Sequence, residues 1–390
     1  SAASDVYKRQ KRDHALASNM HNTVLKTLFT ATRRASRAES DGSWIGSDPT
    51  FHWLVRHVGT FFAHVTQTRV VYVEKQGPGR AVLSTDMLFR LTLLASVVAV
   101  ALATEPIKVD RKVLFHSHND YVHHRPVYDA FDHGVLSFES DFWFDEHKKA
   151  LYVAHTPLGI DHSKTFNTQT VDRVLNIVQG KYSDKYPASN VKKFYADPKN
   201  QPTAHPDWYK YFSEGFGGVR PIMILAEPKT SADPDMWKTV VDALGELRSQ
   251  GLLTRYEYGK VHFGPVIVVG TGNTPYSQVV ATPVRDYFMD CHADGLKDEH
   301  GQFQYNATAC PISSAGYPSV PHSNLGLTPP PKAAIPYFAK YTCDAHIINS
   351  TVRFYGVPKT AGRIDDFNML LQQGADWLNI DHFDDVKRYS

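Results

Sequence analysis

The sequence lacks the short motifs that identify several large classes of enzyme. It contains no P-loop for nucleotide phosphates, no Rossmann dinucleotide fingerprint and no convincing nucleophile elbow. Its three cysteines do not have the paired spacing of zinc ligands. These absences leave carboxylate and imidazole side chains as the main candidates for catalysis.

The chain also has no strongly basic region of the kind that binds nucleic acid. Its formal net charge is +2, but residues 104–390 carry 29 Lys and Arg against 33 Asp and Glu, a net charge of −4. Domains that bind nucleic acid concentrate positive charge to neutralise phosphates. The sequence therefore gives no reason to expect a nucleic acid as partner.

No apolar run is long enough to cross a membrane comfortably, which takes roughly 20 residues. The most apolar segment, 87–103, begins with Met87, contains one Arg and ends with Ala101-Leu102-Ala103. This pattern is typical of a secretory signal peptide. We therefore predict a secreted protein that makes at most peripheral contact with a membrane.

The segment before Met87 is expected to lie outside the folded protein. If Met87 is the start, residues 1–86 are a non-native or untranslated extension that we expect to be disordered. A mitochondrial transit peptide from Met20 is the alternative, because that stretch is basic and contains no acidic residue before Glu39. This alternative leaves the apolar segment 87–103 unexplained.

Secretion is compatible with a disulfide and with glycans. Cys291 and Cys310 are a candidate disulfide pair that leaves Cys343 free, although pairing cannot be deduced from sequence alone. Asn306 and Asn349 each begin a glycosylation sequon, a triplet that also arises by chance.

Apolar runs of strand length alternate with helical patterns along residues 104–390, which form one predicted domain. Strands are expected at 113–118, 135–144, 221–226, 266–269, 287–291, 351–355 and 376–380, with a short extra one at 148–153 and another hidden within 292–329. Helices are expected at 125–133, 171–179, 234–250, 332–341 and 364–373. Repeated βα units favour a (β/α)8 TIM barrel, with a doubly wound open sheet as the alternative.

One segment, 181–220, interrupts this alternation and reads as an insertion over one face of the fold. Packing onto the barrel is the favoured role for its aromatic side chains, and a lipid-facing lip is the alternative. These side chains are Tyr182, Tyr186, Phe194, Tyr195, Trp208, Tyr209, Tyr211 and Phe212.

Three carboxylates stand at the ends of predicted strands. Glu139 and Asp141 are two residues apart, so both project from the same face of their strand, and Glu227 ends another strand. Carboxylate oxygens at the mouth of a barrel suit a hard divalent ion. We therefore predict that they bind one Mg²⁺ or Ca²⁺, rather than lying as solvated surface residues.

Two of the 20 histidines are candidates for general acid/base catalysis. His118 ends the first predicted strand, and His155 follows the short strand at 148–153. His116 is the nearest rival of His118, but it lies deeper in the strand. Lys229 stands two residues after Glu227, where it could hold a phosphate or neutralise the carboxylates.

These motifs resemble the PLC-like phosphodiesterase superfamily, which includes glycerophosphodiester phosphodiesterases and sphingomyelinase D. The chain is most similar to the fungal branch named for altered inheritance of mitochondria protein 6. The matching stretches are H-N-D-Y at 118–121, R-P at 125–126, E-S-D at 139–141, L-Y-V-A-H at 151–155, E-P-K at 227–229, V-R-F-Y at 352–355 and A-D-W-L-N-I-D at 375–381.

The resemblance implies a PLC-like barrel in which His118 and His155 are the acid/base pair and Lys229 lies near the substrate phosphate. Many glycerophosphodiesterases have Arg where this chain has Asn119, which we expect to contact phosphate without supplying charge. The predicted function is hydrolysis of a phosphodiester, such as a glycerophosphodiester or the headgroup of a phospholipid or lysophospholipid.

Two other functions are compatible with the same sequence. One is a different metal-dependent barrel enzyme, such as a sugar-phosphate isomerase or hydrolase. The other is a secreted barrel that has lost activity and serves as a binding protein, although the retained histidines and carboxylates argue against it.

Overall fold

The computed structural model describes residues 109–390 apart from short gaps at 187, 232, 324–329 and 361. These residues belong to one compact unit, Thr104–Ser390. The segments 1–86 and 87–103 lie outside the described residues, so their assignment as an extension and a signal peptide stays a prediction.

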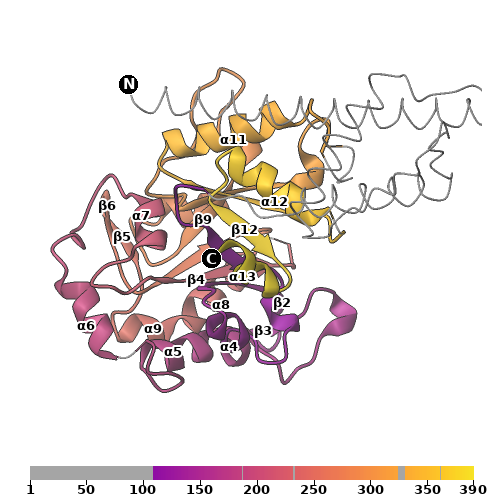
Figure 1. The fold of residues 1–390 in the computed structure, drawn as a ribbon. Coiled ribbons are helices and arrows are strands. Elements are labelled where there is room, and N and C mark those ends of the chain that lie inside the picture. Colours follow the sequence, from indigo (N-terminus) through magenta and orange to yellow (C-terminus); the bar gives the residue numbers. More distant parts are fainter. Residues whose placement is uncertain (1–108, 187, 232, 324–329, 361) are drawn as a thin grey trace, which may run out of the picture. The chain divides into compact units, whose positions relative to one another are not determined.

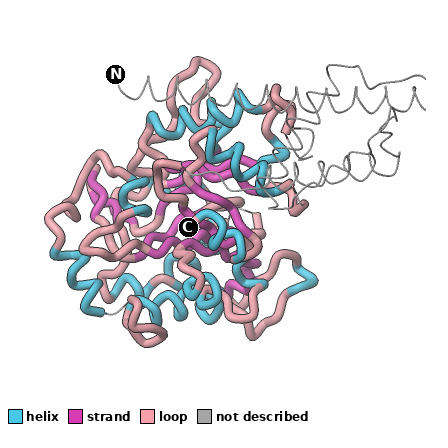
Figure 2. The backbone as a smooth tube through the Cα atoms, in the orientation of Figure 1, coloured by secondary structure: helices cyan, strands magenta, loops and turns pink. Residues whose placement is uncertain are grey.

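The centre of this unit is a closed barrel of parallel strands. In the described part of the chain, eight strands pair in the order β1-β12-β11-β10-β9-β7-β4-β2, and β1 also pairs with β2, which closes the ring. The strands are β1 (Leu114–Ser117), β2 (Ser137–Asp145), β4 (Ile222–Pro228), β7 (Val266–Gly270), β9 (Phe288–His292), β10 (Ile312–Gly316), β11 (Thr351–Tyr355) and β12 (Trp377–Ile380). Helices surround them (Figure 1 and Figure 2). The predicted (β/α)8 barrel is confirmed.

Helices follow most of the strands, as repeated βα units require. They are α4 (Tyr128–Asp132), α5 (Asp172–Val178), α8 (Pro234–Ala243), α9 (Gly245–Ser249), α10 (Tyr276–Ala281), α11 (Ile335–Ile347), α12 (Arg363–Gln372) and α13 (Asp384–Tyr389). The prediction of one helix over 234–250 is wrong, because the backbone leaves the helical range at Leu244 and Gly245, a poor helix former, follows. Helix α4 begins later than predicted because Val127 has a φ of 65°.

The sequence did not predict three short strands, and it placed the sixth barrel strand only within a broad segment. Strand β10, hidden within 292–329, has the sequence I-S-S-A-G, which contains no apolar run. Strands β5 (Arg255–Glu257), β6 (Lys260–His262) and β8 (Val284–Arg285) form a small separate sheet and are too short to show a period. The extra strand β3 (Ala150–Val153) pairs antiparallel with β2.

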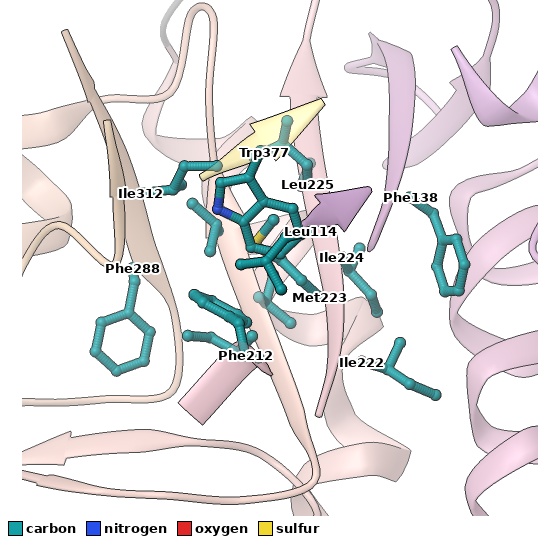
Figure 3. Close-up of a cluster of buried hydrophobic side chains, with 14 of the residues drawn as sticks. Leu114, Phe138, Phe212, Ile222, Met223, Ile224, Leu225, Phe288, Ile312 and Trp377 are labelled. Carbon is teal, nitrogen blue, oxygen red and sulfur yellow. The ribbon is translucent and has the colours of Figure 1, made fainter. Parts of the chain in front are cut away.

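The insertion at 181–220 covers the amino end of the barrel. It contains α6 (Ala188–Ala196) and α7 (Trp208–Ser213). The ring of Phe212 lies 5.0 Å from that of Trp377, the first residue of β12, and both join the core of the barrel (Figure 3). The Tyr211 hydroxyl donates to the carbonyl of Gly264, just before β7. The favoured packing role is therefore what the structure shows. Most of these side chains are buried, at the end opposite to the strands' carboxyl ends, which favours packing over the alternative of a lipid-facing lip.

Two further features concern the cysteines and the helices. Cys291 and Cys310 form a disulfide with their Cα atoms 5.7 Å apart, which ties the end of β9 to the segment before β10, and Cys343 is free and exposed. Within the described residues, no helix combines the length and the apolar character that crossing a membrane requires.

Candidate active site

The three predicted carboxylates meet at the carboxyl end of the barrel. Glu139 and Asp141 project from β2, and Asp141 is in register with Glu227 on the neighbouring strand β4. One oxygen from each of the three lies within 4.8 Å of the others. We call these residues the acidic triad. Two of its members are buried, with Glu139 only 4% and Asp141 0% exposed.

Asp141 lies at the centre of a dense set of polar contacts. Its Oδ2 accepts from the ammonium of Lys229 at 2.9 Å and lies 2.9 Å from Nδ1 of His155. The Tyr121 hydroxyl lies 2.8 Å from the same oxygen. The other oxygen, Oδ1, is buried and has no hydrogen-bond partner among the described residues. A buried carboxylate oxygen without a partner is costly, so this atom is suited to a ligand.

Lys229 joins two members of the acidic triad. Its Nζ lies 2.6 Å from Glu227 Oε1 as well as 2.9 Å from Asp141 Oδ2. Burial alone would lower the pKa of Lys229, but the hydrogen bonds to Glu227 and Asp141 outweigh burial and raise it. The side chain therefore carries a positive charge at neutral pH.

The turn after β7 approaches the side chain of Glu227 closely. Gly272, in the turn after β7, has a φ of +56°, and a Cβ at this position would lie 2.7 Å from Glu227 Cγ. Only glycine combines this backbone conformation with the close approach of the carboxylate.

Glu139 is held from both sides. The backbone N–H of Asn119 donates to its Oε2 at 2.9 Å, and the guanidinium of Arg353 lies 3.6 Å from its Oε1. Asn119 has a φ of 50°, a left-handed conformation that Asn tolerates better than most residues. Its side-chain amide lies 3.4 Å from the ring of His118. The structure thus places Asn119 between the triad and His118.

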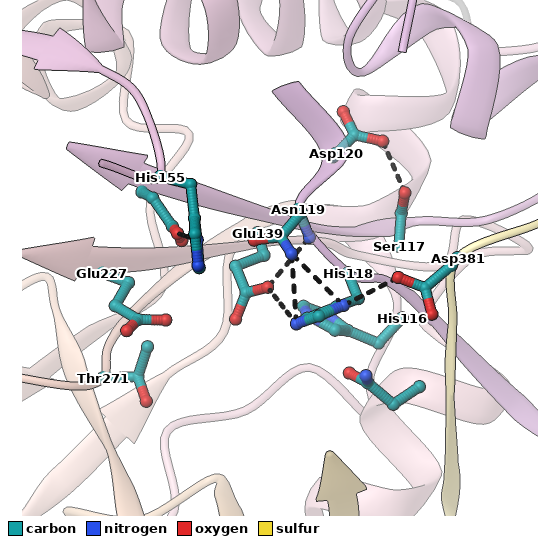
Figure 4. A network of polar contacts seen from close by, with 12 residues as sticks. His116, Ser117, His118, Asn119, Asp120, Glu139, His155, Glu227, Thr271 and Asp381 are labelled. Carbon is teal, nitrogen blue, oxygen red and sulfur yellow. Dashed lines mark hydrogen bonds and ion pairs between the residues drawn. The ribbon is translucent and has the colours of Figure 1, made fainter. Parts of the chain in front are cut away.

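His118 has a carboxylate partner on each side of its ring. Its Nδ1 lies 2.9 Å from Asp381 Oδ1, and its Nε2 lies 3.6 Å from Glu139 Oε2 (Figure 4). Burial lowers the pKa of His118, but the hydrogen bond to Asp381 and the charges of Glu139 and Asp381 outweigh it and raise the pKa. Burial would raise the pKa of Asp381, yet contacts with His118 and Lys359 lower it to about 2.

His116 lies below His118 in the barrel. It is completely buried, its Nδ1 lies 2.6 Å from the hydroxyl of Ser137, and burial followed by the charges of Arg353 and His118 holds its pKa well below the usual value. A neutral, enclosed imidazole is suited to packing, whereas His118 and the 62% exposed His155 face the mouth.

Several residues that complete the site were not assigned a role from the sequence. Arg353 is 2% exposed and lies 3.2 Å from Asp290 Oδ2, which also accepts from Thr271. The sequence feature that could have identified Arg353 is its place as a single arginine inside the apolar strand V-R-F-Y, because a buried arginine requires acidic partners. Asp381 ends a predicted strand, and Tyr121 belongs to the H-N-D-Y stretch.

The fold and this site together define the class of protein. A histidine held by a carboxylate, a second histidine and a lysine surround an acidic triad at the carboxyl end of a (β/α)8 barrel, where barrel enzymes place their active sites. This arrangement agrees with the PLC-like phosphodiesterase barrel that the sequence motifs resemble.

Comparison with known proteins shows similarity to one family within that class. Residues 107–290 match the family described as AIM6-like phosphodiesterase domain, which confirms the predicted resemblance.

Curated relatives carry the same family name. The altered inheritance of mitochondria protein 6 homolog of Arthroderma benhamiae is 27% identical over 76% of this chain and 96% of its own length. Altered inheritance of mitochondria protein 6 of Eremothecium gossypii is 25% identical over 75% of this chain and 72% of its own. Among solved structures, the phosphatidylinositol-specific phospholipase C from Listeria monocytogenes covers 74% of this chain and 97% of its own at 8% identity, with a TM-score of 0.36.

Proposed function

We propose that this protein is a divalent-metal-dependent phosphoric diester hydrolase that uses His118 and His155 as its acid/base pair. One observation carries the proposal: both histidines contact carboxylates, Asp381 and Asp141, on opposite sides of one acidic triad. Two proton-transferring groups flanking a charge-binding centre are what displacement at a phosphodiester requires.

The acidic triad is suited to one Mg²⁺ or Ca²⁺. Its three carboxylates offer hard oxygen ligands, and the buried Oδ1 of Asp141 has no other partner among the described residues. A divalent ion held by Glu139, Asp141 and Glu227 would polarise a phosphoryl oxygen and offset its charge.

His118 is placed to accept a proton. Because Asp381 takes the hydrogen on Nδ1, the lone pair of Nε2 is available to deprotonate the nucleophile, which is either water or a neighbouring hydroxyl of the substrate. The new P–O bond then forms as the bond to the leaving alcohol breaks. His155, whose Nδ1 is held by Asp141, donates the proton from Nε2 to the leaving oxygen. If a hydroxyl of the substrate attacks, the first product is a cyclic phosphate.

Lys229 and Asn119 supply contacts to the phosphate. The ammonium of Lys229 lies beside the triad, and the amide of Asn119 lies beside His118, so both can donate to phosphoryl oxygens. We further propose that the substrate is a glycerophosphodiester or the headgroup of a phospholipid or lysophospholipid, and that residues 104–390 act as a secreted domain after removal of 87–103.

The test is an activity screen of the purified protein against glycerophosphodiesters, lysophospholipids and sphingomyelin, with Mg²⁺, with Ca²⁺ and with a chelator. Phosphorus NMR separates a cyclic phosphate from a phosphomonoester product. We expect turnover that the chelator abolishes, and a loss of roughly 10²- to 10⁴-fold in His118→Ala and His155→Ala. Full activity in both variants, or turnover of sugar phosphates but of no diester, would overturn the proposal.

A further inference from the structure

Lys229 occupies the position between two members of the acidic triad. Its ammonium lies 2.6 Å from Glu227 Oε1 and 2.9 Å from Asp141 Oδ2, and each of these oxygens belongs to a predicted metal ligand. A divalent ion that draws ligands from Glu227 and Asp141 must therefore share these carboxylates with a positive charge already in contact with them.

Among the described lysines and arginines, Lys229 and Arg353 contact the acidic triad, and they differ in their freedom to move. Arg353 is 2% exposed and is held by Ser314, Asn379 and Asp290 as well as by its contact with Glu139. Its planar, enclosed guanidinium has no room to leave.

Lys229 is held differently. Its backbone is fixed, since its N–H donates to the carbonyl of Phe142 and its carbonyl accepts from Asn273. Its side chain is 19% exposed, and both of its ion pairs are with the triad. A flexible stem with four carbons allows the ammonium to move while the backbone stays in place.

We propose that Lys229 is an internal competitor for the divalent ion, and that it leaves the triad for the substrate phosphate when the ion binds. This inference rests on the proposed function, because it assumes that the triad is the metal site. It adds that Lys229 weakens the affinity for metal, and that the same charge is then used on the substrate.

The charge of Lys229 should have a measurable effect on the affinity for a divalent ion. Two like charges within a few ångströms repel strongly even at the effective dielectric constant of a protein surface, enough to change an affinity by about tenfold or more. Removing the ammonium while keeping the carboxylates should therefore strengthen metal binding, although removal of a phosphate contact should weaken catalysis.

The experiment measures the dissociation constants of Mg²⁺ and Ca²⁺ by titration calorimetry, without substrate, on the full chain and three variants. Lys229→Met removes the competing charge, and Lys229→Arg keeps it. Lys359→Met is the matched control, because Lys359 carries the same charge at the same mouth but contacts Asp381 rather than the triad. Circular dichroism and thermal unfolding establish that each variant is folded.

We expect Lys229→Met to bind metal at least about tenfold more tightly than the wild type, and Lys229→Arg and Lys359→Met to stay within about threefold of it. Equal or weaker binding in folded Lys229→Met would overturn the proposal, as would equal tightening in Lys359→Met, which reveals only a general charge effect. If Lys229→Met does not fold, unchanged affinity in Lys229→Gln would overturn it instead. Because no diester is present, failure here is distinct from an absence of hydrolase activity.

Discussion

Nδ1 of His118 lies 2.9 Å from Oδ1 of Asp381, although 263 residues separate them in the chain. The contact exists because β1 and β12 are neighbours in the closed barrel, with Ser117 paired to Ile380. Each residue directly follows its strand, so barrel closure places the two side chains together. The proposed base is therefore oriented by the last strand of the fold.

This contact makes Asp381 a positioning residue with a pH signature. Asp381 raises the pKa of His118, so Asp381→Asn should lower that pKa. A general base works in its neutral form, so the ascending limb of the pH profile of kcat/KM should move to lower pH. Turnover at the optimum should also fall at least about tenfold, because the ring loses its orientation. Asp384→Asn, which removes an exposed carboxylate three residues further along the chain, should leave both the limb and turnover unchanged.

Gly272 should be essential for the acidic triad. Gly272→Ala would force a Cβ to within 2.7 Å of Glu227 and displace its carboxylate, so metal affinity and turnover should each fall at least about tenfold. Gly301→Ala is the matched control. Gly301 also has a positive φ, +77°, but no atom lies within 4 Å of its added Cβ. Equal losses in both variants would attribute the effect to backbone strain and not to Glu227.

The main expected effect of replacing Arg353 is a loss of stability. Arg353→Met leaves Glu139 and Asp290 buried without their guanidinium, which should lower the free energy of unfolding by about 3–5 kcal/mol. Urea denaturation measures this loss. Arg388→Met removes an exposed arginine from α13 and should change stability by less than about 0.5 kcal/mol. A loss of similar size in both variants would contradict the role given to Arg353.

If the protein enters the secretory pathway, the two sequons should differ in how often they carry a glycan. Asn306 is exposed, and the hydroxyl of Thr308 in its sequon bonds to its side chain at 2.7 Å. The sequon of Asn349 ends in Thr351, whose buried hydroxyl donates to the carbonyl of Pro311 within the barrel wall. Peptide mass spectrometry of secreted protein should find glycan mainly on Asn306. Glycan on Asn349 alone would contradict this expectation.

The sequence was informative where each strand has an apolar core and a polar end. It predicted the strand at 351–355 with the bounds that β11 has, and it predicted that Glu139, Asp141 and Glu227 would converge. Strand β10 stayed hidden because its serines face partners inside the fold, as Ser313 does with Ser350. Such contacts depend on tertiary structure and leave no periodic pattern.

The other features that could not be predicted from the sequence depend on contacts between residues far apart in the chain. Asp381 and Arg353 are polar residues beside or within apolar runs, but their partners, His118 and Glu139, come from the other end of the domain. The sequence also could not show that the insertion 181–220 covers the amino end of the barrel. That placement depends on partners such as Trp377, which only the closed barrel brings near the insertion.

The central claim is that the two histidines and the acidic triad together cleave a phosphodiester. Its most direct test is the turnover of a panel of glycerophosphodiesters and lysophospholipids by the wild type, followed by phosphorus NMR with and without a chelator, beside His118→Ala. The account predicts a phosphomonoester or cyclic phosphate product that disappears with the chelator and falls by roughly 10²- to 10⁴-fold in the variant. Turnover that is indifferent to both changes, or no diester cleaved by a folded protein loaded with Mg²⁺ or Ca²⁺, would contradict it.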